Sequence, residues 1–203
     1  MVSPRSSSSR LMNALVCIAT GSEEMEAVNI IDVLRRGNIQ VTVAKVHDPQ
    51  QHYDPSNLRV IGSRGVKLEA DAHFDDVVDQ EYGAIILPGG MGGAKIFSEN
   101  TKLLNRLTKQ KKSEHGIVAA ICASPALVLT KHNLLDGVKK VTCYPSLKDK
   151  MPHYDWHDEK VVVDGNVVTS QGPFTAVFFA LKLIELMVSK EASQEVAKGL
   201  LVH

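Results

Sequence analysis

The 203-residue sequence has few of the features that define several large classes of protein. It contains three cysteines, Cys17, Cys122 and Cys143, and this odd, widely spaced set argues against a disulfide framework and for a reducing compartment. The 23 Lys and Arg residues are balanced by 23 Asp and Glu residues, so no overall charge favours nucleic acid or a membrane surface. No apolar run approaches the ~18 residues of a membrane span, since Lys182 and Glu185 interrupt the most hydrophobic stretch. We therefore expect one globular domain located in the cytoplasm.

Residues 1–12 differ in composition from the rest of the chain. They carry Ser and Arg, no acidic residue, and no apolar segment of the kind found in secretory signals. Such a start is typical of a short disordered tail, and it also weakly resembles an organelle transit peptide. We expect a disordered tail over 1–12 and a single domain over 13–203, with organelle targeting by the tail as the alternative.

Strand-like and helix-like segments alternate after this tail. The helical period over 24–36, with apolar Met25, Val28, Ile31 and Leu34 and a terminating Gly37, predicts an amphipathic helix. Short apolar runs predict strands over 13–19, 39–46, 84–87, 116–121, 141–144, 161–163 and 167–169, and further helices are expected over 100–112, from 125, and over 174–188. This alternation predicts an α/β sandwich with a mainly parallel sheet and helices on both faces.

Cys122 comes directly after the apolar run 116–121 and before the small residues Ala123 and Ser124. A sharp turn from strand to helix would hold its side chain at the carboxyl edge of the sheet, as in a nucleophile elbow. A helix N-terminus stabilises a thiolate, so we expect the pKa of Cys122 to lie well below that of an ordinary thiol. The alternative is a buried structural cysteine at the end of a strand.

Two other segments should reach the same edge of the sheet, namely 20–26 and 88–93. Glycines in the second segment allow the backbone to approach a ligand, so Gly90 and Ala123 are candidate backbone donors for an oxyanion. A plain turn and helix start would explain the same glycines. The segment is not a phosphate loop, because no Ser or Thr follows Lys95 and the spacing differs.

Five motifs, met in order, resemble those of the ThiJ/PfpI superfamily. They are Gly-Ser-Glu-Glu-Met-Glu-Ala (21–27), Leu-Pro-Gly-Gly (87–90), Ala-Ala-Ile-Cys-Ala (119–123), Leu-Lys-Asp-Lys (147–150) and Thr-Ser-Gln-Gly-Pro (169–173). The branch resembles the one that contains the parkinsonism-associated protein deglycase and its bacterial homologues. The resemblance implies a flavodoxin-like α/β sandwich, a homodimer, and chemistry that needs no cofactor.

The resemblance also implies roles for particular residues. It assigns Cys122 as the nucleophile, Glu26 as its acidic partner, and Gly90 with Ala123 as oxyanion donors. A buried Glu26 beside a thiolate should hold its proton, because burial and a neighbouring anion both raise the pKa of an acid. It could then donate to sulfur and act as a general acid or base.

The alternative role for Glu26 is that of a first-turn acid that complements the helix dipole. Glu23 and Glu24 suit that role better.

Three pocket residues follow from departures or matches within these motifs. Tyr144 stands where some superfamily members have His, so a Cys-His triad and protease activity are not favoured. Phe174 replaces a family glycine and is expected to narrow the pocket. Arg64 should approach the pocket and attract anionic or dicarbonyl oxygens, although a solvated Arg is equally consistent with the sequence.

The remaining candidates concern metal and redox chemistry. Alternating His and Asp over 153–158 could ligate a metal, but a surface loop commonly carries such residues, and no metal site is expected. Cys17 is expected in the core, and Cys143 could be either oxidisable or packed.

The expected function is that of a cofactor-independent glyoxalase or deglycase. Cys122 would attack α-oxoaldehydes such as methylglyoxal, or their adducts on glycated proteins. The alternative is an oxidative-stress sensor or redox-regulated chaperone that uses the same cysteine without turnover.

Overall fold

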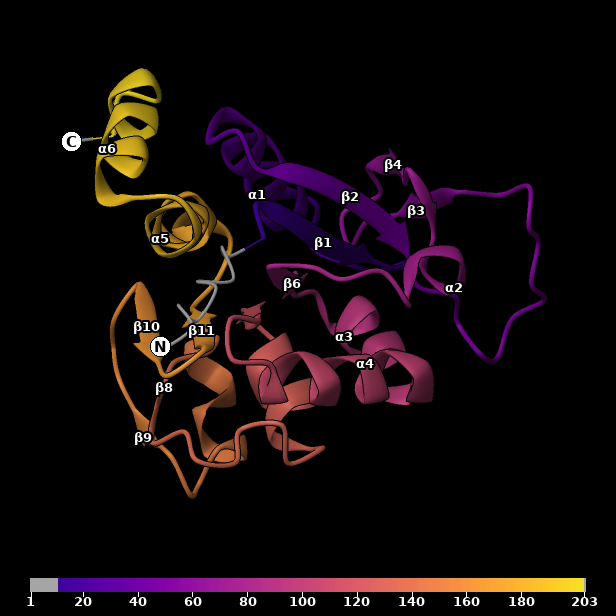
Figure 1. Cartoon of the computed structure of the whole chain (residues 1–203). Coiled ribbons are helices and arrows are strands. Elements are labelled where there is room, and N and C mark those ends of the chain that lie inside the picture. Colours follow the sequence, from indigo (N-terminus) through magenta and orange to yellow (C-terminus); the bar gives the residue numbers. More distant parts are fainter. Residues whose placement is uncertain (1–10, 203) are drawn as a thin grey trace, which may run out of the picture.

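A computed structural model describes residues 11–202, so nearly all of the predicted tail over 1–12 lies outside the described residues. A seven-stranded sheet with the order β10-β11-β7-β6-β1-β2-β5 forms the centre of the domain (Figure 1). Neighbouring strands run parallel except for β10 and β11, so the predicted mainly parallel sheet is confirmed. The strands are β1 (Asn13–Ile18), β2 (Gln40–Lys45), β5 (Ala72–His73), β6 (Ala84–Leu87), β7 (Ile117–Ile121), β10 (Val161–Asp164) and β11 (Val167–Ser170).

Helices cover both faces of this sheet and give the domain two hydrophobic cores. One face carries α1 (Glu24–Arg36), α5 (Ala176–Met187) and α6 (Lys190–Gly199), and the other carries α3 (Met91–Glu99), α4 (Thr101–Lys112) and the π-helical η1 (Pro125–Thr130) (Figure 1). The short α2 (Phe74–Val77) follows β5. Successive strand residues point to opposite faces, so Leu15 joins one core and Val16 the other. Cys122 packs against both cores.

Helix α1 has the predicted bounds but buries a different face. The Glu23 carboxylate caps the helix by accepting from the Glu26 N–H at 2.8 Å, and Gly37 follows its last residue. The side chains facing the core are Ala27, Ile30, Val33 and Leu34. Met25 and Val28, which the sequence grouped with Leu34, are 56% and 47% exposed, so the prediction of their face was wrong.

Two smaller sheets flank the central one. Strands β3 (Arg59–Ile61) and β4 (Lys67–Glu69) form an antiparallel hairpin, whereas β8 (Lys140–Val141) and β9 (Asp155–Trp156) pair in parallel. The predicted strand over 141–144 ends at Val141, because the Thr142 N–H donates to Thr169 Oγ1 and the Tyr144 N–H donates to the Cys122 carbonyl. The remaining 3-10 segments are η2 (Pro145–Lys150) and η3 (Pro173–Thr175).

No helix within residues 11–202 is both long enough and apolar enough to cross a membrane.

Candidate active site

The carboxyl ends of β1, β6 and β7 meet at one edge of the sheet, as predicted. The segment after β1 contacts the segment after β6 through the Glu23 N–H, which donates to the Gly89 carbonyl at 3.0 Å. Cys122 follows β7, and the adjacent Ser124 hydroxyl donates to the Pro88 carbonyl at 2.6 Å. The topology therefore brings together the three segments that carry the candidate residues.

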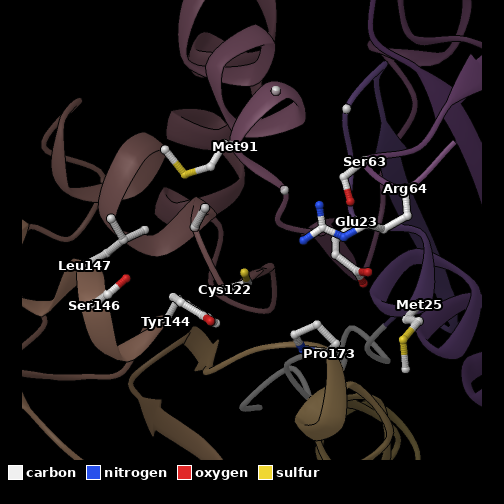
Figure 2. Close-up of a pocket in the computed structure, with 14 residues that line it drawn as sticks. Glu23, Met25, Ser63, Arg64, Met91, Cys122, Tyr144, Ser146, Leu147 and Pro173 are labelled. Carbon is white, nitrogen blue, oxygen red and sulfur yellow. The ribbon is translucent and has the colours of Figure 1, made fainter.

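Cys122 has a left-handed backbone conformation, with φ +63°. A non-glycine residue rarely adopts this conformation unless its surroundings fix it, and such strain is concentrated at functional sites. The Cys122 N–H donates to the Ser170 carbonyl at 3.0 Å, and its carbonyl accepts from the Tyr144 N–H at 2.9 Å. These two hydrogen bonds hold the turn and direct the sulfur into a pocket of about 780 Å³ (Figure 2).

Glu26 lies behind the sulfur and is fully buried. Its Oε2 accepts a 2.6 Å hydrogen bond from the Gly89 N–H. Among the described residues, no group meets ordinary hydrogen-bond geometry to its Oε1, although the Cys122 thiol is close enough to interact with the carboxyl group. Burial raises the pKa of Glu26 to about 7, against opposing hydrogen bonds from Gly89 and Cys122. A sizeable share of this acid is thus protonated at neutral pH.

The prediction of a lowered thiol pKa was wrong for the site with Glu26 ionised. Burial and the negative charge of Glu26 raise the pKa of Cys122 to about 12, while the N–H groups of Gly90 and Ala123 lower it. The repulsion disappears when Glu26 carries the proton. The two groups consequently titrate as a pair, and a thiolate forms most readily when its proton resides on Glu26.

Two glycines make this close approach feasible. A Cβ at Gly89 would lie 2.5 Å from Cys122 Cβ and 2.8 Å from Glu26 Oε2. Gly90 has φ +84°, and a Cβ there would overlap the Gly21 carbonyl oxygen and lie 2.6 Å from the Glu23 nitrogen. The glycine pair thus lets a backbone N–H reach the carboxylate and another reach the sulfur.

The pocket receives some of the predicted residues and excludes one. Arg64 and Tyr144 line it on different sides of Cys122, and Met25 and Leu147 add apolar surface (Figure 2). Phe174 does not line the pocket: it is 79% exposed and makes a tilted ring contact with Phe178, so the prediction that it narrows the pocket was wrong. Its neighbour Pro173 lines the pocket instead.

Glu24 has a role that the sequence did not indicate. It was grouped with Glu23 as a first-turn acid, but its side chain is buried and accepts hydrogen bonds from Ser63 and Arg64. No local sequence signal marks this contact, because the partners lie 39 and 40 residues away in the chain.

The other two cysteines are fully buried, which supports packing roles. Burial raises the pKa of Cys17, and burial also raises the pKa of Cys143 to about 11. In the 153–158 segment His157 pairs with Asp155 at 2.9 Å and with Glu159 at 3.3 Å. Across residues 11–202 no three His, Cys, Asp or Glu side chains are grouped as metal ligands.

Burial of Glu26 should make folding pH-dependent. The pKa of its carboxyl group is raised from the ordinary 4.5 to about 7 in the folded protein. The contribution of neutral Glu26 to the free energy of unfolding is therefore fully present below about pH 4.5, and it is lost as the pH rises through about 7. The separation corresponds to about 3 kcal/mol. Urea denaturation should be measured below about pH 4.5 and above about pH 7. Cys122→Ser should show this loss of stability between the two conditions, and the double variant Cys122→Ser/Glu26→Gln should not. The same pH dependence in both variants would contradict the assignment.

Comparison with known proteins shows the family to which the chain is similar. A model of the DJ-1/PfpI family matches residues 12–186. The chain is 45% identical over 188 residues to protein DJ-1 homolog B of Arabidopsis thaliana, an alignment that covers 93% of the chain and 41% of that protein. It is 33% identical over 181 residues to glutathione-independent glyoxalase DJR-1.2 of Caenorhabditis elegans, covering 88% of the chain and 90% of the relative. The solved structure of oxidized Toxoplasma gondii DJ-1 has a TM-score of 0.84 and 40% identity, covering 93% of this chain and 97% of that one.

The chain belongs to the DJ-1/PfpI family, which confirms the resemblance found in its motifs and its flavodoxin-like fold. It spans about two fifths of the length of the Arabidopsis relative and nearly all of the Caenorhabditis one.

Proposed function

We propose that the chain is a cofactor-independent glyoxalase that converts α-oxoaldehydes such as methylglyoxal to hydroxy acids through Cys122. The observation that carries this proposal is the thiol on a strained turn at the pocket, with the buried Glu26 carboxyl behind it. The name of the Caenorhabditis relative, a glutathione-independent glyoxalase, supports the same chemistry.

In the first step the Cys122 sulfur attacks the aldehyde carbon and Glu26 accepts the thiol proton. The carbonyl oxygen becomes an oxyanion beside the N–H groups of Gly90 and Ala123, which interact with the sulfur in the unliganded site. Protonation of this oxyanion by Glu26 gives a hemithioacetal and regenerates the carboxylate.

In the second step Glu26 removes the hydrogen on the former aldehyde carbon and returns that proton to the adjacent carbon, while the hydroxyl proton of the hemithioacetal passes to the oxygen on that adjacent carbon. The product is a thioester of Cys122, and water hydrolyses it to a hydroxy acid and the thiol. A carboxyl group with a pKa of about 7 suits both directions of transfer at neutral pH.

The same chemistry on adducts of Arg, Lys or Cys side chains would be deglycation. The pocket, at about 780 Å³, falls in the roughly 300–1,000 Å³ range that accommodates ligands much larger than methylglyoxal. This volume supports substrates that include a protein side chain.

A redox sensor is the second candidate, and one contrast among the cysteines favours it. Cys122 reaches a pocket, whereas Cys17 and Cys143 are fully buried. The Toxoplasma gondii relative was solved as an oxidized protein. Two equivalents of peroxide would convert the thiolate to a sulfinate with release of two waters, and the neighbouring N–H groups would stabilise the added oxygens.

A homodimer also belongs to the proposal. Met25 and Val28 of α1 and Ile61 and Val66 of the β3–β4 hairpin are large apolar side chains that are about half exposed. Their exposure supports burial against a second copy of the chain. A cytoplasmic location is likewise proposed, and the unpaired thiols support it.

Sustained conversion of methylglyoxal to lactate by the purified protein tests the enzymatic proposal. We expect many equivalents of lactate per protein chain, none from Cys122→Ala, and wild-type amounts from a Lys112→Met control on the exposed surface of α4. Consumption of only about one equivalent of aldehyde per chain, or equal rates with and without Cys122, would contradict the enzymatic proposal. The redox sensor would then be the remaining candidate.

A further inference from the structure

A buried carboxylate that the proposed mechanism does not use lies beside the pocket. Glu24 is the first residue of α1, and only 5% of it is exposed. Its oxygens accept from Ser63 Oγ at 2.9 Å, the Arg64 N–H at 2.7 Å and the Val66 N–H at 3.3 Å. Burial would raise the pKa of Glu24, but these hydrogen bonds and one from its own backbone hold it below the ordinary value. The group is therefore an anion at neutral pH.

The segment that Glu24 holds is the turn over 62–66, between β3 and β4. The Gly62 N–H closes this turn by donating to the Val66 carbonyl at 2.8 Å, and the Ser63 N–H donates to the Ser22 carbonyl at 2.8 Å. A Cβ at Gly62 would lie 2.7 Å from the Glu24 carboxyl carbon, so the turn packs directly on the carboxylate. Three donors thus converge on a group that can only accept.

The turn carries Arg64, whose guanidinium points toward the middle of the pocket from the side of the hairpin (Figure 2). None of the ion pairs formed within residues 11–202 includes this side chain. An uncommitted guanidinium that faces a reactive thiol attracts anions to it.

We propose that Glu24 is a positioning residue: it fixes the 62–66 turn so that Arg64 selects reactants with a carboxylate or phosphate group close to the carbon attacked by Cys122. The inference rests on Cys122 being the reactive thiol of the proposed function, but it does not require turnover. On this proposal the anionic Glu24 increases the reactivity of Cys122 toward anionic reactants, because it holds Arg64 in place. If Glu24 acted only through its own negative charge, it would decrease that reactivity.

Iodoacetate and iodoacetamide provide a matched pair of probes for this sign. Each forms a bond between the Cys122 sulfur and its methylene carbon as iodide leaves, and the two differ in charge. The measured quantity is the rate constant for iodoacetate divided by the rate constant for iodoacetamide. Cys122→Ser serves as the blank. We expect Arg64→Met and Glu24→Gln each to lower this ratio about two- to fivefold, the size typical of a partly exposed charge. The double variant should show no further decrease.

Two further variants keep the test decisive. Lys112→Met removes an exposed cation from the last turn of α4 and should leave the ratio unchanged. Ser63→Ala keeps the Glu24 carboxylate, removes one of its donors, and should lower the ratio by less than Glu24→Gln; it also serves if Glu24→Gln fails to fold. An unchanged or raised ratio in Glu24→Gln, or in Ser63→Ala when the first variant does not fold, would overturn the proposal. Lowered ratios in a protein that shows no turnover would uphold the positioning role while removing the glyoxalase function.

Discussion

Replacing Glu26 by Gln should lower kcat for methylglyoxal about 10²–10⁴-fold, while Cys122 still reacts with iodoacetamide at a rate close to or above that of the wild type. An amide cannot accept the proton that the second step takes from carbon. The same substitution removes the negative charge that raises the pKa of the thiol, so alkylation has no reason to slow. Steady-state lactate production and single-turnover alkylation measure the two effects in one variant.

The control for this comparison is Glu81→Gln, which removes a surface acid paired with Lys109. It should leave both turnover and alkylation unchanged. Small and equal losses in Glu26→Gln would remove Glu26 from the mechanism and favour Cys122 as a redox group. A large loss confined to turnover would support proton transfer by Glu26.

The second large effect concerns stability. Gly90→Ala should lower the free energy of unfolding by at least about 3 kcal/mol, because two costs combine. The backbone at φ +84° and ψ +130° lies in a sparsely populated region, which costs of order 1–3 kcal/mol for a residue with a Cβ. The new Cβ would also overlap the Gly21 carbonyl oxygen and approach the Glu23 nitrogen. Urea denaturation under reducing conditions measures the loss.

Gly137→Ala is the matched control for that substitution. Gly137 has a similar φ of +77°, but a Cβ there meets no atom within 4 Å. It should therefore show the cost of a positive φ without a close contact, and a larger loss in Gly90→Ala is expected from the packing after β6. Equal losses of unfolding free energy in both variants would show that the segment over 88–93 can move to accommodate a side chain. That result would contradict the close packing described for this segment.

Local signals in the sequence were sufficient for most of the fold. Helix α1 begins after its Glu23 cap and ends before Gly37, and β6 spans the predicted residues. The helix period, the terminating glycine and the apolar run of the strand all lie within or next to the element that they predict. The buried face of α1 was predicted wrongly, because Met25 and Val28 have the right spacing for a core stripe and only tertiary packing decides which stripe is covered. Helix α6 gave no expectation, since Ser193 is its one buried residue.

The site shows the same division between local and long-range information. Sequence placed Cys122, Glu26 and the Gly-rich segment at one edge because parallel strands share that edge. It could not place Phe174 outside the pocket or assign Glu24 to the 62–66 turn, since both depend on contacts between distant segments. The direction of the thiol pKa also depends on burial and on the charge of a partner, neither of which a motif specifies.

Cys122 contacts the hydrophobic cores on both faces of the central sheet. A substituent on its sulfur, whether an acyl group or oxygen atoms, is therefore attached to a residue that packs against the helical layers on both faces of the sheet. Thermodynamic linkage makes such an effect reciprocal: if a modified sulfur strengthens or weakens the folded domain, folding favours or opposes that modification by the same free energy. The redox potential of the Cys122 thiol and the free energy of unfolding of the domain are linked in this way, so a change in one is accompanied by a change in the other.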